Sequence, residues 1–91
     1  MKQPLVVTTA HRGVFFGYGE RTDESTIRLE QARMCVSWPP ENRSVVGLAS
    51  DGPKKGARVG PAAPAITLRD VTAVMEASEE AAKAWEKGPW F

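Results

Sequence analysis

The stretch Gly13-Val14-Phe15-Phe16-Gly17-Tyr18-Gly19-Glu20 decides the fold that we predict for this chain. It is an apolar aromatic run that three glycines interrupt, at positions 13, 17 and 19. Glycine is unfavourable inside a flat strand, so these glycines indicate a sharp bend, a bulge or the close approach of another backbone. The run therefore predicts the bent second strand of a very small β-barrel.

The residues on either side of this run predict its neighbouring strands. Residues 5–9 are largely β-branched and lead into a tight turn, which predicts the first strand. After a polar turn at 21–25, Ile27 and Leu29 alternate with charged residues. This alternation predicts a half-buried third strand over residues 26–30.

The middle of the chain contains two pairs of residues that end regular secondary structure, Pro39-Pro40 and Gly52-Pro53. Extended character resumes over residues 34–38 and ends at Pro39-Pro40, so a bulge or bend is expected near Ala32-Arg33. The segment 44–50 ends just before Gly52-Pro53. Its length allows a short helix that Ser44 would start or a short buried strand, and we favour the helix.

The last third of the chain predicts two more strands and a helix. Residues 65–68 and 71–75 read as the fourth and fifth strands, or as one strand that a bulge interrupts. Ser78 is the expected cap of a helix over residues 79–87. Trp85 is the largest apolar residue of that helix, and we expect it to anchor the helix to the sheet.

The spacing from Gly13 to Ala32 resembles the first half of the Sm-like and SH3-like small barrels. The likeness bears on the fold and assigns no RNA binding. The predicted class is therefore mainly β (α+β), a small bent five-stranded SH3-like or Sm-like barrel or sheet. It has a short middle helix and a C-terminal helix, in a single domain over residues 1–91.

Composition excludes several classes of protein. A single cysteine, Cys35, excludes an internal disulfide, and a single histidine, His11, excludes a zinc cluster of ordinary spacing. We expect no metal and no cofactor. The sequence has no long apolar run and no signal-peptide core, so we expect a cytoplasmic protein without a membrane partner. The net charge of +1 confines electrostatic attraction to local patches.

The small size of the chain predicts self-association. A domain this short buries a small share of its surface, so a subunit interface is a simple way to add stability. The terminal pair Trp90-Phe91 is expected to fold back on the sheet or to enter a neighbouring subunit. We therefore expect a homo-oligomer.

The most biased stretch of the chain covers residues 52–69, which include four cationic residues and no acidic one. Glycines in this stretch allow backbone N–H groups to converge on an anion, and the cations add charge. The alternative is an exposed hairpin loop whose lysines only keep the protein soluble.

The sequence does not predict an enzyme. Nucleophilic catalysis needs a base and an orienting acid beside a serine or cysteine, and only His11 is available as a histidine base. Cys35 lies in an apolar strand and is expected to be a buried core residue. Asp23 and Glu24 are adjacent acids in a turn, where such residues are usually solvated.

A nucleotide-binding site fits the residues better, because a base stacks on aromatic rings while its phosphates take charged donors. Phe15 and Phe16 point to opposite faces of their strand, so one of them belongs to the core. Trp38 or Tyr18 would stack the base. The predicted ligand-binding residues are Arg12, Tyr18, Arg33, Trp38, Lys54, Lys55 and Arg58.

Several parts of the chain resemble a family of small phage and prophage proteins: the opening at residues 6–8 and the segments 11–17, 32–38, 46–49 and 66–74. Thr8 departs from the apolar opening of that pattern. In size, basic loop and expected oligomerisation the chain is similar in type to phage "sponge" inhibitors such as the Sequestin and Lockin families. Those families bind nucleotide signals that bacterial TIR defence enzymes make.

The resemblance implies a phage-encoded, non-enzymatic protein that sequesters an ADP-ribose-derived or cyclic nucleotide and so inhibits TIR-type (Thoeris) defence. Two alternatives remain open. An Sm-like nucleic-acid-binding module would use the same basic loop, and a ligand-free structural phage protein would use the C-terminal aromatics Trp90-Phe91 as its assembly surface.

Overall fold

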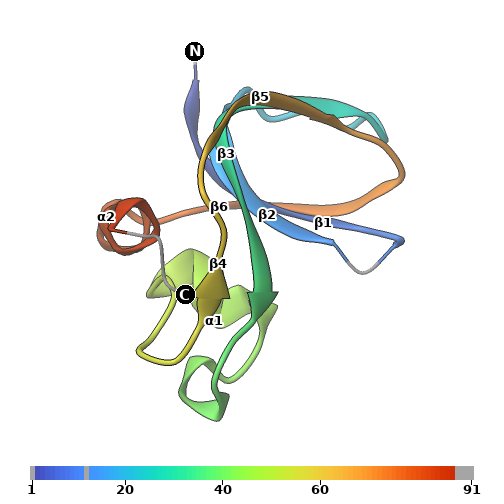
Figure 1. Cartoon of the computed structure of the whole chain (residues 1–91). Helices are drawn as coiled ribbons and strands as arrows, with labels where there is room; N and C mark the ends of the chain where they lie inside the picture. The colour runs from blue at the N-terminus through green and yellow to red at the C-terminus, as the bar shows by residue number, and fades with distance from the viewer. Residues whose placement is uncertain (1, 12, 88–91) are drawn as a thin grey trace.

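A computed structural model describes residues 2–11 and 13–87 (Figure 1). The elements in this part are β1 Gln3–Thr9, β2 Val14–Gly19, β3 Ile27–Ser37, η1 Pro40–Asn42, α1 Val45–Ser50, β4 Arg58–Val59, β5 Ala63–Leu68, β6 Val71–Glu76 and α2 Glu79–Glu86. None of these helices is long and apolar enough to cross a membrane. The predicted mainly β, α+β class with a short middle helix and a C-terminal helix is confirmed.

The strands form one antiparallel sheet in the order β4-β3-β2-β1-β6, and β5 pairs with β3 on the same side as β4. The long strand β3 accommodates both, because β5 pairs with residues 27–32 and β4 with residues 35–37. Strands β5 and β6 lie at opposite edges although only two residues separate them. The sheet must therefore curl to bring the end of β5 to the start of β6, as Figure 1 shows.

Gly17 lies where β3 comes closest to the second strand. A Cβ atom at this position would lie 2.7 Å from the Cβ of Leu29 and 3.1 Å from the carbonyl oxygen of Glu30. Both distances are shorter than ordinary van der Waals contacts. The predicted close approach of another backbone is therefore present, and it excludes a side chain at position 17.

The bulge expected near Ala32-Arg33 is present in β3. Phe16 pairs with Arg33 and Tyr18 with Glu30, so one extra residue of β3 lies between the two pairs. Gln31 has a φ of 51°, a left-handed conformation that is common at irregular strand positions. The two extended segments predicted around the bulge therefore form one strand instead of two.

Apolar side chains are buried on both faces of the curled sheet, because successive residues of a strand point to opposite faces. Val6 and Phe16 belong to a cluster on the face that the helices cover. The other face holds an inner cluster, with Leu5, Val7, Ile27, Leu29, Ala32 and Leu68. The core ring of the predicted aromatic pair is Phe16, which is 1% exposed, whereas Phe15 is half-buried against the inner cluster.

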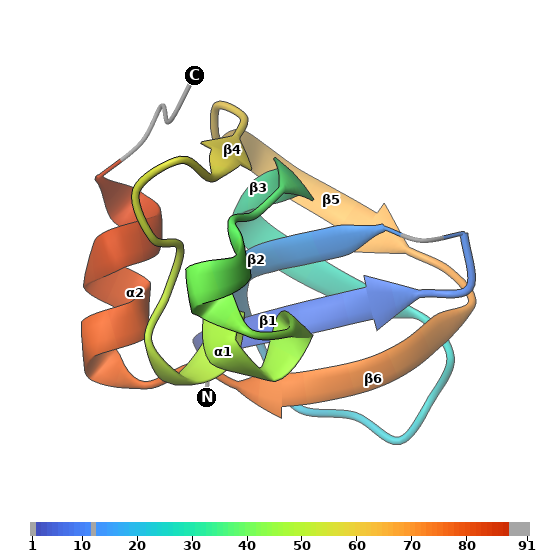
Figure 2. The same ribbon diagram turned by 90° about the horizontal axis from the view of Figure 1, so that it is seen from below.

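Helix α2 begins and docks as predicted. The Ser78 hydroxyl accepts a hydrogen bond from the Ala81 N–H at 3.0 Å and so caps the helix. Trp85 is fully buried, stacks on Phe16 with ring centroids 5.2 Å apart, and donates from Nε1 to the Leu48 carbonyl at 3.0 Å. Figure 2 shows α1 and α2 together at one end of the strands.

Several predicted boundaries differ from the structure. Residues 44–50 form a helix and not a strand, with Ser44 as the N-cap of α1. The basic stretch 52–69 is not one loop, because it contains β4 and β5, and β4 raises the strand number to six. The last two strands pair at opposite edges and are not one interrupted strand. The pair Trp90-Phe91 lies outside the described residues.

Candidate functional site

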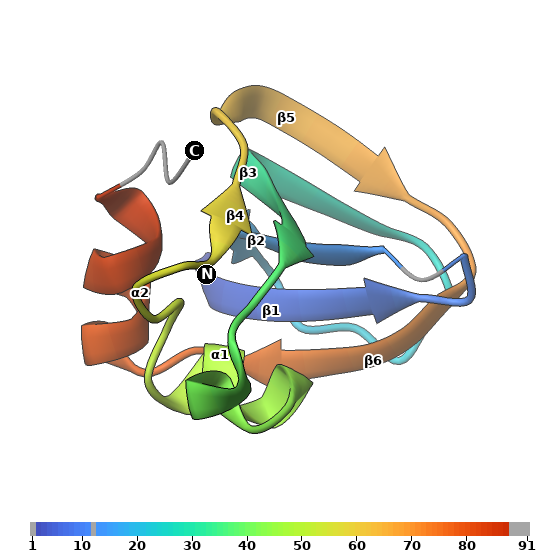
Figure 3. The ribbon, with the colours of Figure 1, turned by 60° about the horizontal axis from the view of Figure 1, so that its bottom comes forward.

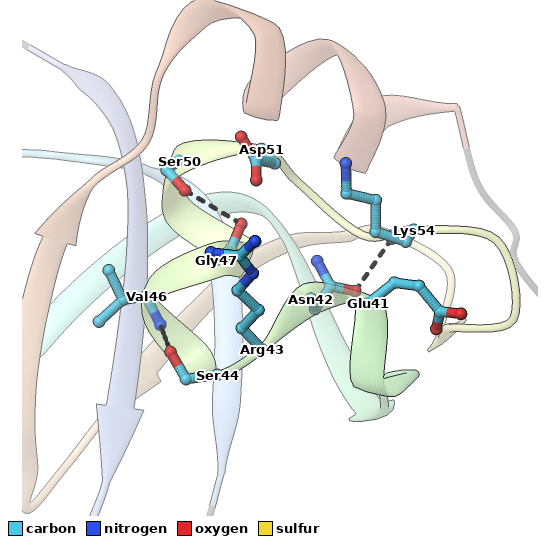
Figure 4. Close-up of a pocket in the computed structure, with 9 residues that line it drawn as sticks. All are labelled: Glu41, Asn42, Arg43, Ser44, Val46, Gly47, Ser50, Asp51 and Lys54. Atoms are coloured by element: carbon cyan, nitrogen blue, oxygen red, sulfur yellow. Dashed lines mark hydrogen bonds between the residues drawn. The ribbon is translucent and has the colours of Figure 1, made fainter.

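The segment between β3 and β4, residues 38–57, carries three of the seven predicted ligand-binding residues and borders a polar groove of about 420 Å³. We call this hollow the α1 groove. Figure 4 shows that its residues come from η1, α1 and the segment after α1. Those that bear on its chemistry are Glu41, Asn42, Arg43, Ser44, Asp51 and Lys54.

The local sequence explains why the chain turns here. Pro39 ends the extended run, and Pro40 opens η1 at a position where proline costs no hydrogen bond. Arg43 then adopts a φ of 71°, which turns the chain toward α1. The hydroxyl of Ser44 accepts a hydrogen bond from the Val46 N–H at 3.2 Å and caps α1.

Asn42 fixes the floor of the groove. Its side chain is 2% exposed and bonds the segment that follows α1 at two points. Its Nδ2 donates to the Gly52 carbonyl at 2.8 Å, and its Oδ1 accepts from the Lys54 N–H at 3.1 Å. A Cβ atom on Gly47 would lie only 1.8 Å from the Asn42 carbonyl oxygen, so α1 packs directly on η1. These contacts set the position of the Lys54 backbone.

Cations at this end of the molecule lack acidic partners. Arg43 and Lys54 line the groove, and Lys55 and Arg58 are exposed beside it. Across residues 2–11 and 13–87, no carboxylate lies within 4 Å of any of these four side chains. An anion could therefore bind without displacing an existing ion pair.

Strand pairing across β3 and β4 brings the backbone of Arg58 next to Ser37, the residue before Trp38. The Trp38 ring is half-buried, with part of it packed on the helix-side cluster. The turn that carries Lys54 and Lys55 closes through an Ala57 N–H bond to the Lys54 carbonyl at 3.0 Å. A ring and three exposed cations thus share one end of the domain.

The structure places two other predicted residues elsewhere. Tyr18 donates from its hydroxyl to Glu86 Oε2 at 2.6 Å, which ties β2 to α2. Desolvation, followed by the bond to Glu86, raises the pKa of Tyr18 to about 12. Arg33 donates from its guanidinium to the Gly60 carbonyl at 3.2 Å. Arg12 lies outside the described residues.

The groups that catalysis could use are dispersed. Cys35 is buried, and burial raises the pKa of its thiol to about 11. His11 Nε2 lies 2.9 Å from Asp70 Oδ2 at the opposite end of the strands. In the part of the chain that the structure describes, no three His, Cys, Asp or Glu side chains gather as a metal site.

Sequence reasoning missed Arg43 and Asn42 as parts of the site. Arg43 directly precedes the predicted cap Ser44. It could have been grouped with the cations of the basic stretch 52–69 as a candidate anion-binding residue. Asn42 gave no sequence signal, because its bonds to Gly52 and Lys54 exist only once the two segments lie side by side.

Comparison with known proteins gives one family. The model of a domain of unknown function, DUF6948, matches residues 2–85. No curated protein matches the chain, and no solved structure does.

Proposed function

The chain belongs to the DUF6948 family, a domain of unknown function, and from this premise we propose that it is a non-enzymatic protein that binds a nucleotide-derived anion. The α1 groove and the cations beside it form the binding site. Arg43, Lys54, Lys55 and Arg58 bind the phosphates, and Trp38 stacks the base.

One observation carries this proposal: four cations at one end of the domain have no ion-pair partner among residues 2–11 and 13–87. Cations without ion-pair partners can bind a polyphosphate, although Glu41 and Asp51 also line the groove and lower its positive potential. The half-buried ring of Trp38, which follows the residue that pairs with Arg58, offers one face for a base.

The state of two reactive groups supports the proposal of binding without turnover. The buried Cys35 thiol is kept protonated by its raised pKa, so it is a poor nucleophile. His11 lies at the far end of β1 from the basic residues and is engaged by Asp70. Among residues 2–11 and 13–87, neither His11 nor Cys35 lines the groove, and the acids that do line it are Glu41 and Asp51.

The resemblance to phage sponge proteins extends the proposal to a biological role. The protein would sequester an ADP-ribose-derived or cyclic nucleotide in the host cytoplasm and so inhibit TIR-type (Thoeris) defence. A second copy of the chain over the α1 groove would enclose the ligand. The proposed form is therefore a homo-oligomer, which native mass spectrometry measures directly.

Calorimetric titration with ADP-ribose tests the site. The triple variant Lys54→Gln, Lys55→Gln, Arg58→Gln is expected to bind on the order of 100-fold more weakly, because each charge-assisted bond contributes at least about 1 kcal/mol. Lys83→Gln on α2 is the matched control and keeps the affinity of the unaltered chain. Equal affinity of the triple variant and the control would refute the site.

A second measurement tests the sponge role. Protein incubated with the products of a TIR enzyme is washed and heated, and the released small molecules are identified by mass spectrometry. The proposal expects an intact nucleotide in the released fraction. The proposal would be refuted if that fraction contained no nucleotide and ADP-ribose also failed to bind in the titration.

A second candidate function is supported by the exposed cations Lys55 and Arg58 and by the half-buried ring of Trp38, since a stacking ring among cations also suits single-stranded nucleic acid. Oligonucleotide binding depends steeply on salt because condensed counterions are released. Retention of oligonucleotides that falls steeply with salt, in a protein that does not bind ADP-ribose, would favour this Sm-like role.

A further inference from the structure

A second hollow of about 540 Å³ lies between the β1–β2 hairpin and the corner that joins β5 to β6. We call it the hairpin pocket. Phe15, Met34 and Leu68 form its floor, and His11, Arg69 and Asp70 form its rim. Figures 2 and 3 show this hairpin at the opposite end of the strands from α2.

Two residues of the floor, Phe15 and Met34, belong to a row of apolar side chains that the pairing of four strands places side by side. Val74 pairs with Val7, Val7 with Phe15, and Phe15 with Met34, across β6, β1, β2 and β3. Exposure rises from β1 to β3, since Val7 is fully buried, Phe15 is half-buried and Met34 is 44% exposed. The row therefore carries the inner cluster out to an open, water-facing surface beside the pocket.

The rim is held from both sides. The Ala10 N–H donates to the Asp70 carbonyl at 2.9 Å, and His11 Nε2 lies 2.9 Å from Asp70 Oδ2. Asp70 itself has a φ of 56°, so the corner adopts the left-handed conformation that aspartate tolerates better than most residues. The pocket is consequently formed before any ligand binds.

Arg69 is the charged rim residue that lacks an ion-pair partner within residues 2–11 and 13–87. The carboxylate of Asp70 is engaged by His11, whereas Arg69 is exposed. Within the described ranges 2–11 and 13–87, no carboxylate lies within 4 Å of the Arg69 guanidinium. A ligand that brings one negative charge to this rim therefore gains a partner at no cost to an existing pair.

We propose that the hairpin pocket binds a small molecule with a flat apolar body and one carboxylate, such as an aryl carboxylic acid. Its ring packs on Phe15 and Met34, and its carboxylate accepts hydrogen bonds from Arg69. Apolar pockets with a few convergent polar groups are the usual form of small-molecule sites, and this volume lies in their range. The site is separate from the α1 groove and takes a different class of ligand.

NMR titration of the ¹⁵N-labelled protein tests this assignment with phenylacetate, its neutral isostere phenylacetamide, and acetate. Phenylacetate is expected to shift the amide signals of Phe15, Met34 and Arg69. Phenylacetamide and acetate are expected to bind at least about tenfold more weakly, because each lacks one of the two contacts. Arg69→Gln, a change of an exposed residue, is expected to abolish the preference for the acid over the amide.

Lys83→Gln on α2 is the control, since it removes an exposed cation from the other end of the domain. It is expected to leave phenylacetate binding unchanged. Equal affinity of acid and amide, shifts confined to other strands, or an unchanged preference in Arg69→Gln would each overturn the proposal. ADP-ribose titrated against Arg69→Gln reports on the α1 groove independently, so the two proposals fail separately.

Discussion

The α1 groove and the hairpin pocket are built by different means on the same small sheet. The groove is polar and depends on single hydrogen bonds within an irregular segment, above all those of Asn42. The pocket is apolar at its floor and depends on the register of four strands, from Val74 to Met34. The difference teaches that one substitution can remove the groove, whereas the pocket persists as long as the sheet does.

The largest change in stability is expected for a substitution in α2, which tests whether the packing of the helices supports the groove. Trp85→Ala removes a fully buried ring, its stacking on Phe16 and its bond to Leu48, and is expected to lower the free energy of unfolding by about 3–5 kcal/mol. Denaturant unfolding measures the loss. Hydrogen exchange should accelerate more at α1 than in the β1–β2 hairpin.

Trp85→Phe is the control for this change, because it keeps an aromatic ring and removes only the Nε1–H donor and part of the packing. A smaller loss, of about 1–3 kcal/mol, is expected for it. If Trp85→Ala accelerated exchange equally at both ends, the two regions would not differ in their support, and the comparison would be wrong.

Asn42→Ala comes next, since it leaves the Gly52 carbonyl and the Lys54 N–H without partners. An unsatisfied buried group costs about 1–3 kcal/mol, so we expect unfolding to become easier by that amount and ADP-ribose to bind about tenfold more weakly. Phenylacetate binding should stay constant. A parallel loss of both ligands would show that the groove and the pocket are coupled.

Tyr18→Phe is expected to cost about 1 kcal/mol, the usual contribution of one hydrogen bond, here the bond to Glu86. The pKa of Tyr18 is raised from 10.0 to about 12, so folding favours its protonated form. The stability from this group is therefore present below pH 10 and falls as the pH rises toward 12.

Unfolding of both proteins between pH 9 and pH 12 checks this dependence. The raised pKa of Cys35 is common to the two proteins and cancels in the comparison. The difference in stability between the unaltered chain and Tyr18→Phe should shrink with rising pH, and a constant difference would contradict the role of the hydroxyl.

Arg43→Gly is expected to have the smallest effect on stability and the opposite sign. The φ of 71° at Arg43 is strained for a side chain but not for glycine, so the change should stabilise the fold by about 0.5–1 kcal/mol. At the same time it removes a groove cation, and ADP-ribose should bind about threefold to tenfold more weakly. A gain in stability without a loss of affinity would exclude Arg43 from the site.

The parts of the fold with local signals could be predicted from the sequence. The cap Ser78, the anchor Trp85 and the bulge beside Ala32 each follow from short-range chemistry, and the structure confirms all three. The short strand β4 could not be predicted, because two residues have no period and pair only where β3 extends past β5. For the candidate sites, the sequence indicated which cations and aromatic rings could take part but not how they are arranged in space.

The sequence by itself determined the order of five of the six strands and of the two α-helices, the burial of Cys35 and the charge of the basic stretch, because periodicity, caps and composition are local properties. Only the tertiary structure decided which residues meet. Asn42 reaches Lys54, Phe15 pairs with Met34, and His11 reaches Asp70. These contacts join residues 12, 19 and 59 positions apart in the chain, and the curl of the sheet and the packing of α1 on η1 create them.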